Sequence, residues 1–112
     1  MNRISYVDRS FYIFYIGRYR NKHSYTYGLT NDLYSIEFRL KKTLPKCQLL
    51  TYHPIDTSYT PINQFEYVFK NSKCPAPMID LDDMHFICFE ENKNEDLIIV
   101  IDYLFRNPYN DL

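Results

Sequence analysis

The sequence predicts an α+β domain in which helices cover a small β-sheet, with the elements in the order β-β-α-β-α-β-α. Residues 11–28 hold two runs of aromatic and β-branched residues around a short basic patch, a pattern typical of a β-hairpin. Later segments repeat apolar residues at helical spacing. In the first run every residue from 11 to 16 is apolar or aromatic, so we expect a central strand covered on both faces.

The hairpin strands are expected at residues 11–19 and 24–29, and a helix should follow directly. The Thr-Asn-Asp side chains of residues 30–32 can cap its first turn. Its inward residues should be Leu33, Ile36 and Leu40, which follow at helical spacing. We expect this helix to end near Lys42, because Pro45 follows shortly afterwards.

A third strand is expected at residues 47–53, where Pro54 would end it. A turn at residues 56–58 and a cap at Thr60 should lead into a helix over residues 61–71, with Pro61 in its first turn. The apolar stripe of this helix is Ile62, Phe65 and Phe69.

Residues 73–83 should form a loop that becomes acidic at Asp80, Asp82 and Asp83. Residues 85–89 (HFICF) read as a short strand at the edge of the sheet, and Asn94 should cap a last helix. The stripe of that helix is Leu97, Ile98, Ile101, Leu104 and Phe105.

With 112 residues the chain predicts one domain: a lead-in over residues 1–9, a core over 10–72, and an acidic loop, edge strand and final helix over 73–112. Residues 1–50 carry nine Lys or Arg against three Asp or Glu, whereas residues 51–112 carry four against eleven. A surface that binds polyanions is therefore expected in the first half. The alternative is that the two halves attract each other.

Twelve Tyr and eight Phe stand beside no Trp and only two Gly. This surplus indicates a binding face or the codon bias of an AT-rich genome. The three cysteines show no paired spacing, which favours a reducing compartment. The charged amino terminus is unlike a signal peptide, and no apolar run approaches the roughly 20 residues of a membrane span. We expect a soluble, intracellular protein with no membrane partner.

Several short motifs suggest an ancestry. Residues 10–12 (SFY) stand where a GIY motif would, residues 26–28 (TYG) where YIG would, and residues 29–33 (LTNDL) open the first helix. Glu66 lies on the second helix, and residues 85–105 supply a final strand and helix. In these features the chain resembles the GIY-YIG nuclease superfamily, and most closely its branch in phages and large DNA viruses, found with KilA- and Bro-type proteins.

The resemblance implies a phosphodiesterase centre in which Glu66 holds a Mg²⁺ ion, Tyr12 and Tyr27 lie near the attacking water, and an arginine on the first helix offsets phosphoryl charge. The position of that arginine holds Ser35 or Ile36. Arg39, one helical turn further on, is the candidate substitute. Ser10 and Thr26 also depart from the motifs.

Each candidate has a structural alternative. Tyr12 would be a core tyrosine, and Glu66 would pair with Lys70 four residues later. The histidines His23, His53 and His85 lack zinc spacing and suit surface or boundary positions.

The basic patch and the end of the first helix provide candidate nucleic-acid contacts by phosphate pairing and base stacking. The candidates are Arg18, Tyr19, Arg20, Lys22, His23, Tyr25, Lys41 and Lys42. The alternative is an ordinary solvated loop.

The leading expectation is a viral, GIY-YIG-like domain that has lost catalysis and binds DNA or RNA. It would act in the host cytoplasm or nucleus, and no cofactor is assigned to it. The first alternative is an active Mg²⁺-dependent endonuclease that uses Tyr12, Arg39 and Glu66. The second is a protein-interaction module or homodimer, which would use its aromatic surface or the exposed edge of residues 85–89, with the acidic segment 80–96 guarding one face.

The family register makes a geometric prediction as well. Tyr12 and Glu66 should face one concave surface, with Arg39 at its rim and the Tyr12 hydroxyl directed to solvent. Ile36 should face the core.

Overall fold

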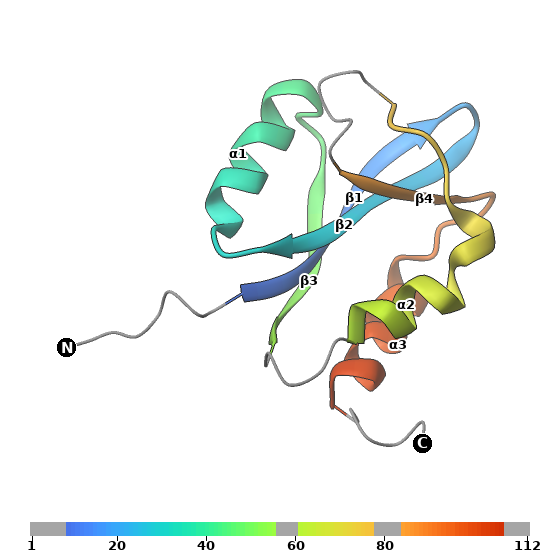
Figure 1. Cartoon of the computed structure of the whole chain (residues 1–112). Helices are drawn as coiled ribbons and strands as arrows, with labels where there is room; N and C mark the ends of the chain where they lie inside the picture. Colours follow the sequence, from blue (N-terminus) through green and yellow to red (C-terminus); the bar gives the residue numbers. More distant parts are fainter. Residues whose placement is uncertain (1–8, 56–60, 78–83, 107–112) are drawn as a thin grey trace.

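The computed structural model describes residues 9–55, 61–77 and 84–106. This part of the chain is α+β, as predicted, with a four-stranded antiparallel sheet and three α-helices (Figure 1). The strands are β1 (Arg9–Tyr19), β2 (Lys22–Thr30), β3 (Gln48–Ile55) and β4 (His85–Phe89), and the helices are α1 (Leu33–Thr43), α2 (Pro61–Val68) and α3 (Asn94–Arg106). The predicted features at residues 1–8, 56–60 and 78–83, including Thr60, Asp80, Asp82 and Asp83, lie outside the described residues.

The sheet has the strand order β3-β1-β2-β4, so β1 is central and β4 lies at an edge, as predicted (Figure 1). The central position of β1 follows from its composition, because only a strand covered on both faces can bury an unbroken apolar run.

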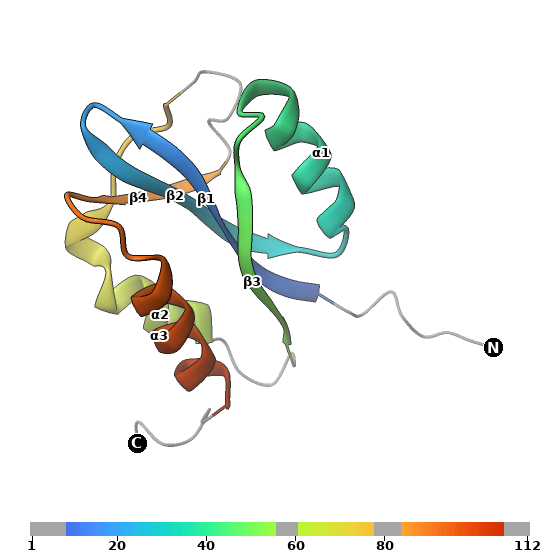
Figure 2. The ribbon, with the colours of Figure 1, turned by 180° about the vertical axis from the view of Figure 1, so that it is seen from behind.

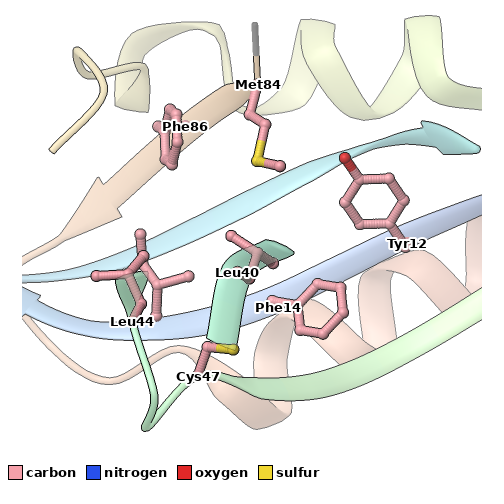
Figure 3. Close-up of a cluster of buried hydrophobic side chains, with 8 residues drawn as sticks. Tyr12, Phe14, Leu40, Leu44, Cys47, Met84 and Phe86 are labelled. Carbon is pink, nitrogen blue, oxygen red and sulfur yellow. The ribbon is translucent and has the colours of Figure 1, made fainter. Parts of the chain in front are cut away.

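Helices cover both faces of this sheet, with α1 on one side and α2 and α3 on the other (Figure 2). Alternate residues of β1 point to opposite sides and therefore enter two separate clusters. The first core, under α1, is Tyr12, Phe14, Ile16, Leu40, Leu44, Cys47, Met84 and Phe86 (Figure 3). The second core, under α2 and α3, is Phe11, Ile13, Tyr25, Tyr27, Phe65, Ile87, Leu97 and Ile101. Leu33 and Ile36 pack against the first core, so the predicted inward face of α1 is confirmed.

The turn between β1 and β2 is shorter than predicted. Only Arg20 and Asn21 lie outside the strands, with φ angles of 54° and 65°. Two consecutive residues with positive φ are typical of a type I′ turn, whose twist matches that of the flanking strands. The Lys22 side chain is exposed, but its backbone pairs with that of Tyr19 in the hairpin. A prediction from side-chain polarity alone therefore made the loop too long.

Gly17, in the Tyr-Ile-Gly string of β1, lies at a break in the β1–β2 register and has a φ of 112°. Such a bulge favours glycine because a side chain strains this conformation. The conformation of the bulge therefore explains why this position holds a glycine.

Two predicted boundaries are wrong. β3 continues through Pro54, which pairs with Ser10, because a proline is tolerated in an edge strand. α2 ends at Val68, and residues Lys70–Ser72 form a separate 3₁₀ turn. The α1 cap is as expected, since the Asp32 side chain accepts a hydrogen bond from the Ser35 backbone N–H at 3.1 Å.

The outer side of β4 is also less open than predicted. Lys73 forms an antiparallel bridge with Ile87, and the Cys74 N–H donates to the Phe86 carbonyl at 3.1 Å. Residues 73–74 thus occupy part of the edge proposed for strand pairing. No helix in the described part of the chain has the length and apolar character to cross a membrane.

Candidate functional site

Two of the predicted catalytic residues, Tyr27 and Glu66, are in direct contact. Tyr27 projects from β2 into the second core, and its hydroxyl donates to Glu66 Oε2 of α2 at 3.0 Å. Burial, and then the hydrogen bond to the carboxylate and its charge, raise the pKa of Tyr27 well above the usual 10.0. Tyr27 therefore remains a proton donor at neutral pH and is poorly suited to activate water.

Glu66 also pairs with Lys73, whose Nζ lies 3.6 Å from the same Oε2 atom. The predicted partner Lys70 instead lies over the Tyr67 ring at 4.5 Å. One carboxylate oxygen thus faces both a phenol and an ammonium group. No group of three or more His, Cys, Asp or Glu residues within the described ranges could hold a metal ion. These residues do not fit a Mg²⁺ site, because the donor atom is already engaged by positive and hydrogen-donating groups.

Tyr12 lies on the opposite face of the sheet, in the first core (Figure 3). Its side chain is 3% exposed, and its ring meets Phe14 edge to face with 5.8 Å between centroids. The hydroxyl lies so close to Gly28 that a Cβ atom there would be 2.8 Å from it. The prediction of a hydroxyl directed to solvent is wrong, because the central strand buries this side chain.

A cavity of about 250 Å³ opens at the edge of β2 where β4 begins, lined by Tyr12, Gly28, Leu29, Ile62 and His85. The His85 ring stacks on Tyr27 at 5.4 Å. In this cavity Tyr12 lies near Ile62 of α2. The prediction that Tyr12 and Glu66 face one concave surface is wrong, since their side chains enter opposite faces of the sheet.

Arg39 is exposed on α1. Leu33 and Glu37 share a cavity with Tyr52 of β3, which shows that this flank of α1 faces β3. At about 100° per residue, Arg39 lies on the other flank. α1, which carries Arg39, covers the opposite face of the sheet from α2, which carries Glu66.

The hairpin tip carries three exposed cations, Arg18, Arg20 and Lys22. None of them forms an ion pair with a carboxylate of the described residues. Arg20 adopts the left-handed conformation, φ 54°, in which a non-glycine residue other than Asn or Asp is unusual.

The end of α1 meets this tip around two side chains, Cys47 and Tyr19. Burial raises the pKa of the Cys47 thiol, and the nearby charge of Lys41 opposes that rise. Burial and then Cys47 raise the pKa of Tyr19. Tyr19 packs against the first core, to which Cys47 belongs. The α1 end and the hairpin tip thus lie at the same end of the molecule (Figure 1).

We call this surface the basic end. It consists of Arg18, Arg20, Lys22, Lys41, Lys42 and Lys46, all exposed. Lys46 was not predicted, although it follows the helix-ending Pro45 and that position signals a surface residue. Lys41 also pairs with Glu37 at 3.8 Å, and Lys42 lies 5.1 Å over the Phe38 ring.

Two predicted stacking residues are engaged in the fold. Tyr25 is fully buried, donates to Asn94 Oδ1 at 2.7 Å and accepts from the Lys93 N–H at 2.8 Å. Its prediction as a stacking residue is wrong, because its face of β2 is the second core. His23 hydrogen-bonds the Tyr15 hydroxyl through Nδ1 at 2.8 Å and stacks on that ring.

In comparisons with protein-family models, with curated proteins and with solved structures, the chain matches none. The resemblance to GIY-YIG nucleases therefore rests on the order of the elements and on a few motif positions.

Proposed function

We propose that this chain is a nucleic-acid-binding domain, a GIY-YIG-like fold of viral type whose nuclease centre has degenerated. DNA or RNA would bind at the basic end through its phosphates. Six exposed cations from the hairpin, the end of α1 and the loop after it supply the charge, and within the described residues Lys41 alone among them pairs with a carboxylate.

The observation that carries this proposal is Arg20. A type I′ turn favours glycine or asparagine at both central positions, yet the first holds an arginine at φ 54°. The chain keeps an exposed, charged side chain in this turn despite a conformational cost of about 1 kcal/mol. A purely structural turn gives no reason for that choice.

Arg20→Gly separates the two roles, because glycine suits the turn and removes the charge. We expect this variant to be at least as stable as the wild type and to bind short DNA and RNA oligonucleotides several-fold more weakly at low salt. Its plot of log affinity against log salt should be shallower by about one unit. The matched control is Arg9→Gln, at the opposite end of β1.

Fluorescence anisotropy across a salt series provides the measurement. Absence of binding at low salt, where the phosphate contribution is strongest, would overturn the proposal. Equal losses in Arg20→Gly and Arg9→Gln would show that only net charge matters.

Loss of cleavage is supported by the contacts of Glu66 with Tyr27 and Lys73, and by Ser35 and Ile36 at the arginine position. Plasmid DNA incubated with Mg²⁺ or Mn²⁺ should stay intact. Cleavage that Glu66→Ala abolishes would favour the active endonuclease instead.

A second candidate function is that of a protein-interaction module. It is favoured by exposed aromatic residues on α1 and on the neighbouring strand β3. Tyr34, Phe38 and Tyr52 are 85%, 68% and 52% exposed, and Tyr52 lies on the edge strand β3. Such a patch beside an edge strand suits strand pairing with a second chain. Light scattering tests the homodimer: a concentration-dependent dimer that Phe38→Ser dissolves supports it, whereas a strict monomer opposes it.

A further inference from the structure

The three free cysteines have different environments. Cys47 belongs to the buried first core, whereas Cys74 and Cys88 are half-buried and line the same cavity of about 220 Å³ beside the hairpin tip. The Cys47 thiol is therefore buried, whereas small reagents can reach the thiols of Cys74 and Cys88.

Backbone pairing brings the two accessible thiols together. Lys73 bridges Ile87, and the Cys74 N–H bonds to the Phe86 carbonyl, so residues 73–74 run antiparallel to β4. In this register the side chains of Cys74 and Cys88 lie on one face as diagonal neighbours. The two thiols are close enough for each to affect the ionisation of the pair.

The cavity that the thiols line also contains Arg20 and Lys22. Burial, and then the hydrogen bond and charge of Cys88, raise the pKa of Cys74 to about 12, while Lys22 and Arg20 act in the opposite direction. Cys74 therefore keeps its proton and donates it toward Cys88.

We propose that Cys74 and Cys88 are a redox pair that closes to an intramolecular disulfide when a hydroperoxide enters their cavity. The Cys88 thiolate attacks one peroxide oxygen, which breaks the O–O bond, forms a sulfenic acid and releases hydroxide that is protonated to water. The Cys74 sulfur then attacks the Cys88 sulfur, and its proton leaves with the displaced hydroxide as a second water. Two thiols and one hydrogen peroxide become one disulfide and two waters.

This chemistry goes beyond the proposed nucleic-acid binding and does not depend on it. It also agrees with a reducing compartment, because the resting pair is reduced and thiols there restore it. The disulfide would link Cys74 covalently to β4, in the wall of the cavity that Arg20 and Lys22 also line.

The test treats the reduced full chain with equimolar hydrogen peroxide, alkylates the remaining thiols and maps the peptides by mass spectrometry. We expect a loss of two hydrogen atoms, a Cys74–Cys88 crosslink and alkylation at Cys47 alone. The folded chain should crosslink roughly tenfold faster or more than the same chain in urea, because the fold holds the sulfurs in contact. Equal rates, or a crosslink that involves Cys47, would overturn the proposal.

Single substitutions test the two roles. Cys74→Ser should leave a sulfenic acid at Cys88 that dimedone traps, and Cys88→Ser should give much less dimedone adduct at Cys74. Cys47→Ala is the matched control and should form the crosslink like the wild type. Equal trapping in the two serine variants would refute the assigned order of attack, and melting curves of the reduced variants confirm that they are folded.

Discussion

The Tyr27 hydroxyl donates a hydrogen bond to the Glu66 carboxylate at 3.0 Å and so joins strand β2 to helix α2. The tyrosine is 1% exposed, whereas the Glu66 side chain is 31% exposed. A buried donor bound to a partly solvated carboxylate makes a stabilising link whose strength depends on the protonation of the tyrosine.

Tyr27→Phe should lower the free energy of unfolding by about 1 kcal/mol at pH 8, because it removes this hydrogen bond. The pKa of folded Tyr27 is raised, so its contribution is complete below the unfolded value near 10 and is lost as pH rises above it. Urea unfolding at pH 8 and above pH 10 should show a smaller alkaline loss in Tyr27→Phe than in the wild type. The exposed Tyr34→Phe is the control, and equal alkaline losses in all three proteins would contradict this.

Gly28→Ala should destabilise the fold by about 1–3 kcal/mol, because the new Cβ would lie 2.8 Å from the hydroxyl oxygen and 3.2 Å from the Cζ atom of Tyr12. Tyr12→Phe removes the closest atom and should recover part of that loss in the double variant. A double-mutant cycle in urea measures the coupling between the two sites. Simple additivity would mean that the hydroxyl is free to move away.

Ile36→Arg should cost about 2 kcal/mol or more, since Ile36 packs against the first core and the substitution brings a charge toward it. Ser35→Arg, on the exposed side, should keep stability within about 1 kcal/mol and retain the Asp32 cap through its backbone N–H. Thermal melts distinguish the two. Wild-type melting of Ile36→Arg would show that the phase of α1 is wrong. Neither variant should cleave plasmid DNA, given the partners of Glu66.

Tyr25→Phe should lower the free energy of unfolding by about 1–3 kcal/mol, because the Lys93 N–H and the Asn94 side chain both lose their partner. Oligonucleotide affinity at a temperature where the variant is folded should match the wild type. A several-fold loss of affinity without a loss of stability would restore Tyr25 as a binding residue.

The sequence predicted the fold well where periodicity decides. An unbroken apolar run identified the central strand β1, and the spacing of Leu33, Ile36 and Leu40 gave the inward face of α1. Local sequence patterns gave wrong boundaries where backbone pairing between strands determines the structure. The exposed Lys22 looks like a loop residue but lies in a strand, and Pro54 lies inside one because an edge strand tolerates it.

The candidate site was harder to predict, because it depends on which face each residue takes. Tyr12 and Tyr27 differ by an odd number of positions across the β1–β2 register, in which Tyr12 pairs with Gly28. That parity places them on opposite faces, and a short motif match does not reveal it. Lys73 and Cys74 became relevant only through their pairing with β4, which no local pattern in residues 73–77 announces.

The separation of the hydrophobic interior into two cores affects how the protein unfolds locally. Each is sealed from the other by a single sheet, and α1 is the one helix among the described elements that closes the first core. Detachment of α1 would expose that core while the second stayed packed, so we expect hydrogen exchange in α1 through partial opening events that leave the amides of β2 protected. Substitutions such as Leu40→Ala should speed exchange in α1 selectively, whereas Leu97→Ala should act on the opposite half. The sheet would then behave as a partition between two units that open independently.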